Sequence, residues 1–271
     1  MRKKFALWCI IIGAICLICS CNLKKNEAVI SEEQLPKLRI GCDEYEPYNY
    51  LDENGKGTGI DADLAKEACS RMGYEPVFVK LDWTEKDKYL EGGKIDCIWD
   101  CFALDNNEND YLWAGPYMES VKSVMVLKDS SIYTFDDLNE KIVAVQGDSC
   151  VENLLLKNQI ADFPQDKKVY CFKNMEETLS ALQQGYVDAA VGDRETLKSY
   201  AQTFSIDYRI LDEDIARENI GVAFSKNADK SLVEKLDQTL SEMKADGTIQ
   251  RILEKYGISS PPDLTGGDKN G

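Results

Sequence analysis

The sequence predicts an α/β protein with two lobes, each a mainly parallel sheet flanked by helices, and three observations support this prediction. Short apolar runs typical of buried strands alternate with segments at helical spacing. The alternation occurs twice, once before and once after about residue 130. Several apolar runs end in a polar or glycine-rich stretch that opens the next helix, as strands of parallel sheets do. Two such lobes with facing loops would enclose a ligand cleft between them.

The first series of elements covers residues 38–127. Strands are expected at 38–42, 77–79, 95–99 and 121–127, and helices at 61–72 and 82–90. Asp61 is expected to cap the first helix, and Gly73 to end it. The strand at 95–99 passes directly into a polar segment from Asp100 to Asp110. Open α/β sheets bind ligands beyond such strand ends, although a solvated acidic loop would give the same pattern.

The second series covers the remainder of the fold. Strands are expected at 142–145, 168–172, 187–191 and 220–224, and helices at 135–138, 149–158, 175–184 and 232–255. The last helix is interrupted at Asp246-Gly247, and the tail at 259–271 is predicted to be flexible.

Composition excludes several classes of function. The chain of 271 residues has a formal net charge of −16 and no basic patch, which argues against a nucleic-acid partner. It contains no histidine, so histidine-dependent catalysis and histidine metal sites are absent. The acidic run from Asp105 to Asp110 lacks the spacing of a calcium loop. No cofactor and no metal are expected.

Residues 1–21 have the pattern of a bacterial export signal. Arg2, Lys3 and Lys4 precede a continuous apolar run that is short for a membrane-spanning helix. The segment 18–21, Ile-Cys-Ser-Cys, resembles the lipobox of bacterial lipoproteins, in which Cys21 would carry the lipid. An uncleaved signal anchor is the alternative. Residues 22–37 are polar and are predicted to be a tether between the lipid and the fold.

Six cysteines lie beyond this signal segment, scattered through mostly apolar runs. Their spacing matches neither a zinc site nor a disulfide framework. Most are therefore expected to be small buried apolar residues. They are Cys42, Cys69, Cys97, Cys101, Cys150 and Cys171.

Six motifs in the same order resemble the extracellular solute-binding proteins of the polar amino-acid class, family 3, which are the receptors of ABC importers. The resemblance extends from Leu38 to about Gly257. The motifs are Leu38–Gly41 followed by Tyr45–Tyr48, Asp52–Gly55 through Thr58–Ala65, Gly93–Asp96, Trp113–Tyr117, Gly185–Ala189, and Lys244–Thr248 with Tyr256–Gly257.

The resemblance implies a periplasmic-binding-protein-like fold of type II. The first lobe would comprise residues 38–127 and 220–258, and the second lobe residues 128–219. Such proteins trap a small molecule by hinge closure and catalyse no reaction. The implied partners are an amino acid or cationic amine, an ABC transporter permease, and the membrane through the lipid anchor. The protein would act as a monomer on the extracytoplasmic face.

The resemblance also implies the residues that bind the ligand. An aromatic ring at Tyr45 would cover the ligand, and Trp83 would contact its side chain. Asp193 would hold the α-ammonium, although an aspartate there could equally cap the following helix. Ser149, beside Asp148, would hold the α-carboxylate at a helix start. The remaining members of the predicted site are Asp100, Cys101, Ala103 and Asn107.

This sequence departs from the family pattern at the carboxylate site. Many relatives carry a serine and an arginine where this chain has Ala103 and Asn107, and an amide cannot replace a bidentate arginine without loss. Three explanations remain open. The ligand could be a cationic amine held by Asp100, Asp105 and Asp193. Another arginine, such as Arg194, could replace the lost one, or the protein could be a sensory or degenerate receptor.

A small-molecule dehydratase with the same fold is a less favoured alternative. It would need an acid and a base in the cleft, which Asp100 could supply together with Glu108 or Asp193. The sequence gives no reason to place these groups around a reacting atom.

Overall fold

The computed structural model describes residues 35–51, 56–105, 107–147 and 149–258. The predicted signal segment with Cys21, most of the predicted tether, Asp148 and the predicted tail at 259–271 lie outside these residues. In the portion described, every helix is too short or too polar to cross a membrane.

One eight-stranded sheet forms the centre of both lobes, in the order β4-β1-β5-β10-β6-β9-β7-β8. Three strands pair in parallel in each lobe, and β6 and β10 pair antiparallel with each other between them. The predicted fold of two lobes with mainly parallel sheets is therefore confirmed. The strands are β1 (Lys37–Cys42), β4 (Glu75–Lys80), β5 (Cys97–Ile98), β6 (Leu112–Leu127), β7 (Ile142–Gln146), β8 (Lys168–Phe172), β9 (Ala189–Asp193) and β10 (Tyr208–Phe224).

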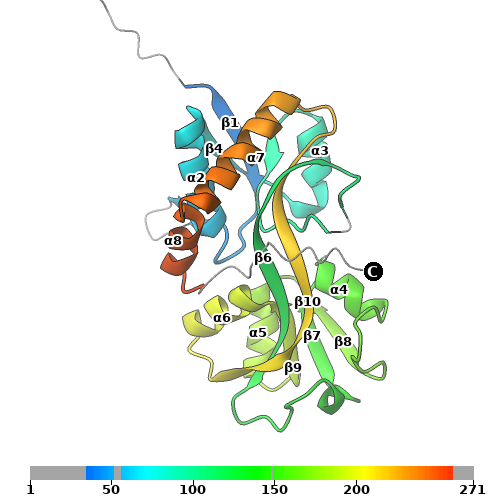
Figure 1. Cartoon of the computed structure of the whole chain (residues 1–271). Helices are drawn as coiled ribbons and strands as arrows, with labels where there is room; N and C mark the ends of the chain where they lie inside the picture. Colours follow the sequence, from blue (N-terminus) through cyan, green and yellow to red (C-terminus); the bar gives the residue numbers. More distant parts are fainter. Residues whose placement is uncertain (1–34, 52–55, 106, 148, 259–271) are drawn as a thin grey trace, which may run out of the picture. The chain divides into compact units, whose positions relative to one another are not determined.

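Helices cover the first lobe, and a small hairpin of β2 (Tyr50–Leu51) and β3 (Gly57–Thr58) adjoins them. Helix α7 packs against β6 and α2, so that this late element joins the lobe that contains β1 and β4 (Figure 1). The helices are α2 (Ile60–Met72), η1 (Trp83–Glu85), α3 (Lys86–Glu91), α7 (Lys230–Ala245) and α8 (Thr248–Lys255).

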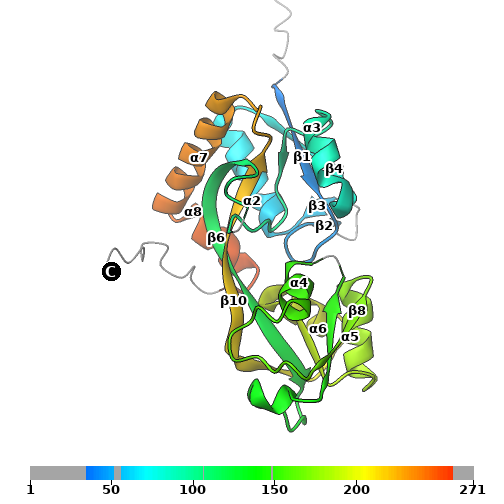
Figure 2. The ribbon, with the colours of Figure 1, turned by 90° about the vertical axis from the view of Figure 1, so that its right-hand side faces the viewer.

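The second lobe has an apolar core on each face of its sheet. Successive residues of β7 point to opposite faces, so that Val143 and Val145 enter one core and Ala144 the other. Both views of the ribbon show α4, α5 and α6 grouped around these strands (Figures 1 and 2). The helices are η2 (Asp136–Leu138), α4 (Cys150–Leu156), α5 (Met175–Gln183) and α6 (Arg194–Thr203).

The two connecting strands, β6 and β10, are longer than the sequence pattern predicts. The expected apolar runs at 121–127 and 220–224 are only one end of each strand, because the other parts carry polar residues and a proline. Val124 and Val126 of β6 already lie in a core of the second lobe. The predicted lobe boundary at residue 127 stays a prediction, and this packing favours a crossing nearer to Met118, which lies in the first core.

One further expectation needs correction. Gly59 occupies the N-cap position of the first helix, and the Asp61 side chain turns inward, because it binds the Cys101 backbone and the Tyr117 hydroxyl of β6. The sequence also gave no expectation for α6. The prediction for the cysteines is confirmed for Cys42, Cys69 and Cys97, which are buried, whereas Cys171 is exposed.

Candidate functional site

Tyr45 and Asp193 are predicted ligand residues that belong to different lobes, and their side chains are in contact in the structure. The Tyr45 hydroxyl donates a hydrogen bond of 2.5 Å to Oδ2 of Asp193. The Tyr45 ring stacks on Tyr48, with 5.7 Å between the ring centroids. Burial, and then the Asp193 carboxylate, raise the pKa of the Tyr45 hydroxyl well above its ordinary value, so Tyr45 acts as a donor at neutral pH. The covering ring and the carboxylate implied by the family resemblance are thus adjacent.

Asp193 does not cap the helix that follows it. It occupies the N-cap position of α6, but its side chain makes no capping hydrogen bond. Instead its Oδ1 accepts hydrogen bonds from the Ser120 hydroxyl and from the Lys122 ammonium, the latter at 2.7 Å. The Lys122 ammonium also lies 3.1 Å from Oε2 of Glu218. We refer to Ser120, Lys122, Asp193 and Glu218 as the Asp193 cluster.

The sheet register explains why these four side chains meet. Lys122 of β6 lies directly opposite Asp193 of β9, and Glu218 of β10 lies opposite Ser120. Ser120 and Lys122 are two residues apart and therefore share one face of β6. Directly opposed residues of neighbouring strands place their side chains on the same face. The cluster is thus fixed by three adjacent strands.

The charges of the Asp193 cluster are buried. Lys122, Asp193 and Glu218 are 4 %, 5 % and 5 % exposed. Burial alone lowers the pKa of the Lys122 ammonium, but Asp193 and Glu218 more than offset this effect, and the pKa lies above the ordinary lysine value. Lys122 is therefore a permanent cation beside the carboxylate that the family resemblance assigns to the ligand's ammonium.

Asp100 serves the first lobe itself. Its carboxylate accepts hydrogen bonds from the Asp43 backbone N–H at 2.7 Å and from the Asn49 side-chain amide at 2.8 Å. Burial raises the pKa of the Asp100 carboxyl well above its ordinary range. A buried carboxyl with both oxygens occupied by its own lobe is a poor counter-charge for a cationic ligand.

Asp61, which the sequence analysis placed only at a helix start, holds Cys101, the residue that follows Asp100. Its buried carboxyl accepts the Cys101 backbone N–H at 2.6 Å and the Tyr117 hydroxyl at 2.7 Å. Cys101 has a φ of 46°, in the left-handed region that a side chain rarely adopts. Asp61 therefore helps to fix Cys101 in an unfavourable backbone conformation at the end of β5.

The residues that replace the family's serine and arginine also bind within the protein. Ala103 forms a β-bridge with Ile220 of β10. The Asn107 amide donates to the Ala103 carbonyl at 3.0 Å. The Asp105 carboxylate accepts from the backbone and side-chain amides of Asn219. We refer to the described residues 99–105 and 107 as the 99–107 loop; these contacts fasten it to itself and to β10.

The other predicted residues occupy structural positions. The Ser149 hydroxyl accepts the Glu152 backbone N–H at 3.1 Å and thereby caps α4. The Trp83 ring packs edge-on against Phe102 at 5.2 Å and remains partly exposed. The Arg194 guanidinium donates to Ser123 at 2.9 Å and pairs with Asp214. Arg194 is thus engaged with side chains of both connecting strands, and its replacement of the lost arginine stays a prediction.

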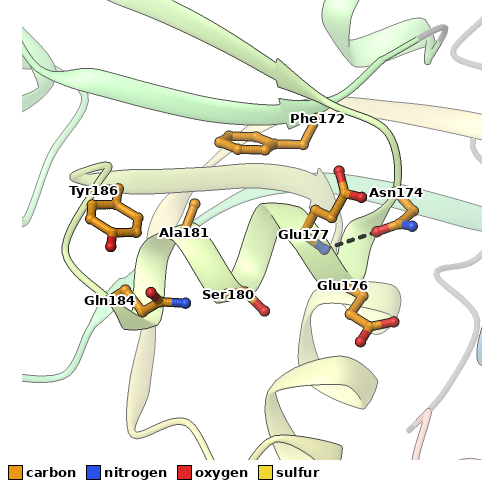
Figure 3. A pocket seen from close by; sticks show the side chains of 8 residues that line it. All are labelled: Phe172, Asn174, Glu176, Glu177, Ser180, Ala181, Gln184 and Tyr186. Carbon is orange, nitrogen blue, oxygen red and sulfur yellow. Dashed lines mark hydrogen bonds between the residues drawn. The ribbon is translucent and has the colours of Figure 1, made fainter.

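A shallow groove of about 500 Å³ lies elsewhere, on the second lobe. It runs from Phe172 of β8 across α5 to Tyr186, and Asn174 at its rim caps α5 through the Glu177 N–H (Figure 3). None of the predicted ligand residues lines it. The groove therefore adds nothing to the site at Asp193.

The fold and the paired residues Tyr45 and Asp193 define a two-lobed solute-binding protein. Residues 38–259 match the bacterial extracellular solute-binding proteins, family 3, and the chain belongs to this family.

Three similar proteins place the chain within this family. A probable histidine-binding protein of Campylobacter jejuni is 27 % identical over 95 % of this chain and 100 % of the relative. An ancestral arginine-binding protein solved with arginine is 31 % identical, with a TM-score of 0.71 over 81 % of this chain and 97 % of that one. An ancestral amino acid-binding protein, described as a precursor of cyclohexadienyl dehydratase, is 29 % identical, with a TM-score of 0.71 over 81 % and 95 % of the two chains.

Lys122 and Glu218 are the site residues that sequence reasoning missed. A signal for Lys122 was present, because it lies two residues before Val124 and four before Val126, on the face of a strand that otherwise enters the core. A lysine at such a position is rare unless it is paired. Glu218 stands in the same relation to Ile220 and Val222 of the first core, but the residues before Ile220 are mostly polar, which makes the signal weaker.

Proposed function

We propose that this chain is the substrate-binding subunit of an ABC importer and captures an amino acid between its lobes. The relatives named above bind, or are described as binding, amino acids. The lipid anchor on Cys21, the location on the extracytoplasmic face of the membrane, the permease partner and the monomeric state belong to the same proposal.

The contact between Tyr45 and Asp193 is the observation that carries the proposal. These two residues come from different lobes, and the family resemblance assigns both to the ligand. A carboxylate flanked by an aromatic ring suits an ammonium group, which gains a charge-assisted hydrogen bond and a cation–π contact. Closure of the lobes on such a ligand would exclude water from both interactions.

The chemistry of the 99–107 loop favours an amino acid over a polycationic amine. Asp100 and Asp105 were the candidate counter-charges for a cationic ligand, and both are occupied by donors of the protein. Asp193 also accepts hydrogen bonds on both oxygens, but the donor to its Oδ2 is the Tyr45 hydroxyl of the other lobe, which a ligand could displace. Asp193 is therefore the favoured candidate of the three. One such carboxylate suits a ligand with one ammonium group.

We also propose that the protein binds its ligand without transforming it. The dehydratase alternative needs Asp100 as an acid or base, together with Glu108 or Asp193. Both Asp100 oxygens accept hydrogen bonds within the first lobe and the side chain is buried, which disfavours Asp100 as a group that exchanges a proton with a ligand. Incubation with any bound compound, followed by mass spectrometry, would reveal turnover if it occurred.

A thermal-shift screen tests the binding proposal. The chain without residues 1–21 would be mixed with the twenty common amino acids, cystine, betaine and linear polyamines. A ligand at a hundred times its dissociation constant adds about 2.7 kcal/mol to the free energy of unfolding. We expect a shift with at least one amino acid, its loss in Asp193→Asn, and its retention in the control Asp136→Asn, which alters an exposed aspartate of the same lobe. Silence across the panel would favour a sensory or degenerate receptor.

The anchor has its own test. Expression of the full chain and of Cys21→Ala, followed by membrane fractionation and metabolic labelling with a fatty acid, compares the two forms. We expect label and membrane association in the first and the loss of both in the second. Label on Cys21→Ala would argue for a different acylated residue, such as Cys19.

A further inference from the structure

Lys122 lies between two buried carboxylates, an arrangement that the family resemblance did not predict. Its ammonium is 2.7 Å from Oδ1 of Asp193 and 3.1 Å from Oε2 of Glu218. These three side chains carry a formal net charge of −1. A buried site with this charge is matched by one additional cation and by no more than one.

The two oxygens of Asp193 have different neighbours. Oδ1 accepts from Ser120 and Lys122, both on β6, whereas Oδ2 accepts from the Tyr45 hydroxyl, which belongs to the first lobe. Oδ2 is therefore the oxygen directed toward the opposite lobe. Displacement of the Tyr45 hydroxyl would give a ligand access to this oxygen alone.

We propose that Lys122 is a specificity-determining residue. Its ammonium occupies Oδ1 of Asp193, so that a ligand can bind only at Oδ2. Its charge also leaves the site with a net charge that one ammonium group neutralises. This inference rests on the proposed function and narrows it to ligands with a single ammonium at the Asp193 end. Glu218 is its counterpart, because it offsets the charge of Lys122 and keeps the site attractive to a cation.

The arrangement disfavours two kinds of ligand. A linear diamine brings a second positive charge toward a site that already contains the Lys122 ammonium, and like charges in a low-dielectric region repel strongly. A deaminated acid supplies no cation, and its carboxylate would approach a site of net negative charge. A compound with one ammonium avoids both penalties.

Three variants of the Asp193 cluster and two surface controls separate charge from packing. In the three charged side chains, Lys122→Met gives a formal net charge of −2, Glu218→Gln gives 0, and the double variant gives −1, as in the parent. Glu85 and Lys88 form an exposed ion pair in the first lobe, so Lys88→Met and Glu85→Gln make the same changes in total charge away from the site. The probes for calorimetry are L-glutamine and the other common amino acids, 1,4-diaminobutane, and 4-carbamoylbutanoate, which is glutamine without its ammonium.

We expect Glu218→Gln to weaken amino-acid binding by about tenfold, because the net attraction for an ammonium is removed. Lys122→Met should raise the affinity for 1,4-diaminobutane relative to the amino acid by about tenfold. The double variant should stay within about threefold of the parent in both affinities, and the two surface variants should match the parent. Circular dichroism and thermal melting establish that each variant is folded. If Lys122→Met does not fold, Glu218→Gln and the double variant still decide the question.

Different results overturn the inference and the proposed function. If the parent binds no amino acid, the proposed function fails. Suppose that the parent binds an amino acid. The charge assignment then fails if Glu218→Gln binds this amino acid with the affinity of the parent, or if the double variant loses as much affinity as Glu218→Gln. In both cases the proposed function stands. Binding of 4-carbamoylbutanoate as tight as that of glutamine would overturn the inference as well, because Lys122 would then replace the ligand's ammonium.

Discussion

The 99–107 loop and the Asp193 cluster both bury polar side chains, but they use them differently. In the loop, Asp100 and Asp105 accept hydrogen bonds from amides of their surroundings, and Asn107 donates to its own turn. In the cluster, the charged groups of three strands bind one another. The polar residues of the loop thus maintain its shape, whereas those of the cluster maintain a charge. The difference teaches that a polar motif near a predicted cleft is not by itself a ligand site.

The largest effect in this comparison is expected for Lys122→Met. Removing one partner of a buried ion pair costs about 3–5 kcal/mol, because the remaining carboxylates lose their counter-charge. The control Lys88→Met breaks an exposed pair and should change the free energy of unfolding by less than about 1 kcal/mol. Urea denaturation of both variants measures the two values. Equal losses would mean that the cluster does not depend on its charges.

Asp61 should give a pH-dependent effect of similar size. Burial raises the pKa of its carboxyl to about 6 from the ordinary 3.8. The folded protein then holds this proton more tightly than the unfolded chain, so the Asp61 contribution to stability falls as the pH rises from about 4 to 6. The shift corresponds to about 3 kcal/mol. We expect the stability of the parent relative to Asp61→Asn to decrease by this amount between pH 4 and pH 7, and a constant difference would contradict the burial argument.

Asp105→Ala tests whether the loop is held mainly by hydrogen bonds to β10. The substitution leaves the Asn219 backbone N–H without its carboxylate, at a cost of about 1–3 kcal/mol. Asp110→Ala, in the exposed part of the same acidic run, is the matched control. Denaturation curves should show a loss only for the first variant, and hydrogen exchange should rise at Asn219.

Tyr45→Phe should have the smallest effect on stability. It removes the hydroxyl that donates to Asp193 but keeps the ring, which costs about 1 kcal/mol for a single hydrogen bond. The variant should retain amino-acid binding, because the ring and the carboxylate remain, whereas Tyr45→Ala should lose it. If the two variants bind equally, the ring does not cover the ligand.

Hydrophobic patterning predicted most elements of the fold. Apolar runs such as 142–145 and 168–172 correspond to observed strands because they are buried or lie beside a buried strand. The connecting strands were underestimated, since a strand that passes from one lobe to the other has no constant buried face. Helix α6 was missed, because its inward residues Thr196, Leu197 and Ala201 form only a short apolar pattern.

The site could be predicted only in part. Tyr45 and Asp193 could be assigned to a site by the family resemblance, because Tyr45 stands in one of its motifs and Asp193 ends the strand that follows another; their contact with each other was not predicted. The contacts of Asp100 and Asn107 within the protein could not be predicted, because they depend on which donors and acceptors the folded chain brings near them. The pairing of Lys122 with Glu218 needs the register of β6 against β10, which is not encoded in either segment alone.

The irregularities of that register bear on how the lobes could move. The pairing of β6 with β10 shifts between Ile210 and Ala216 and again between Ile220 and Val222, but it is regular from Ala216 to Ile220. Bulged positions bend and twist more readily than a regular ladder. Bending at the two irregular positions would leave the stretch with Glu218 and its opposed residues intact. Lys122 and Glu218 would then keep their places beside Asp193 in an open and a closed form, although the Tyr45 hydroxyl of the first lobe would move, so that an ammonium is attracted before the lobes close on it.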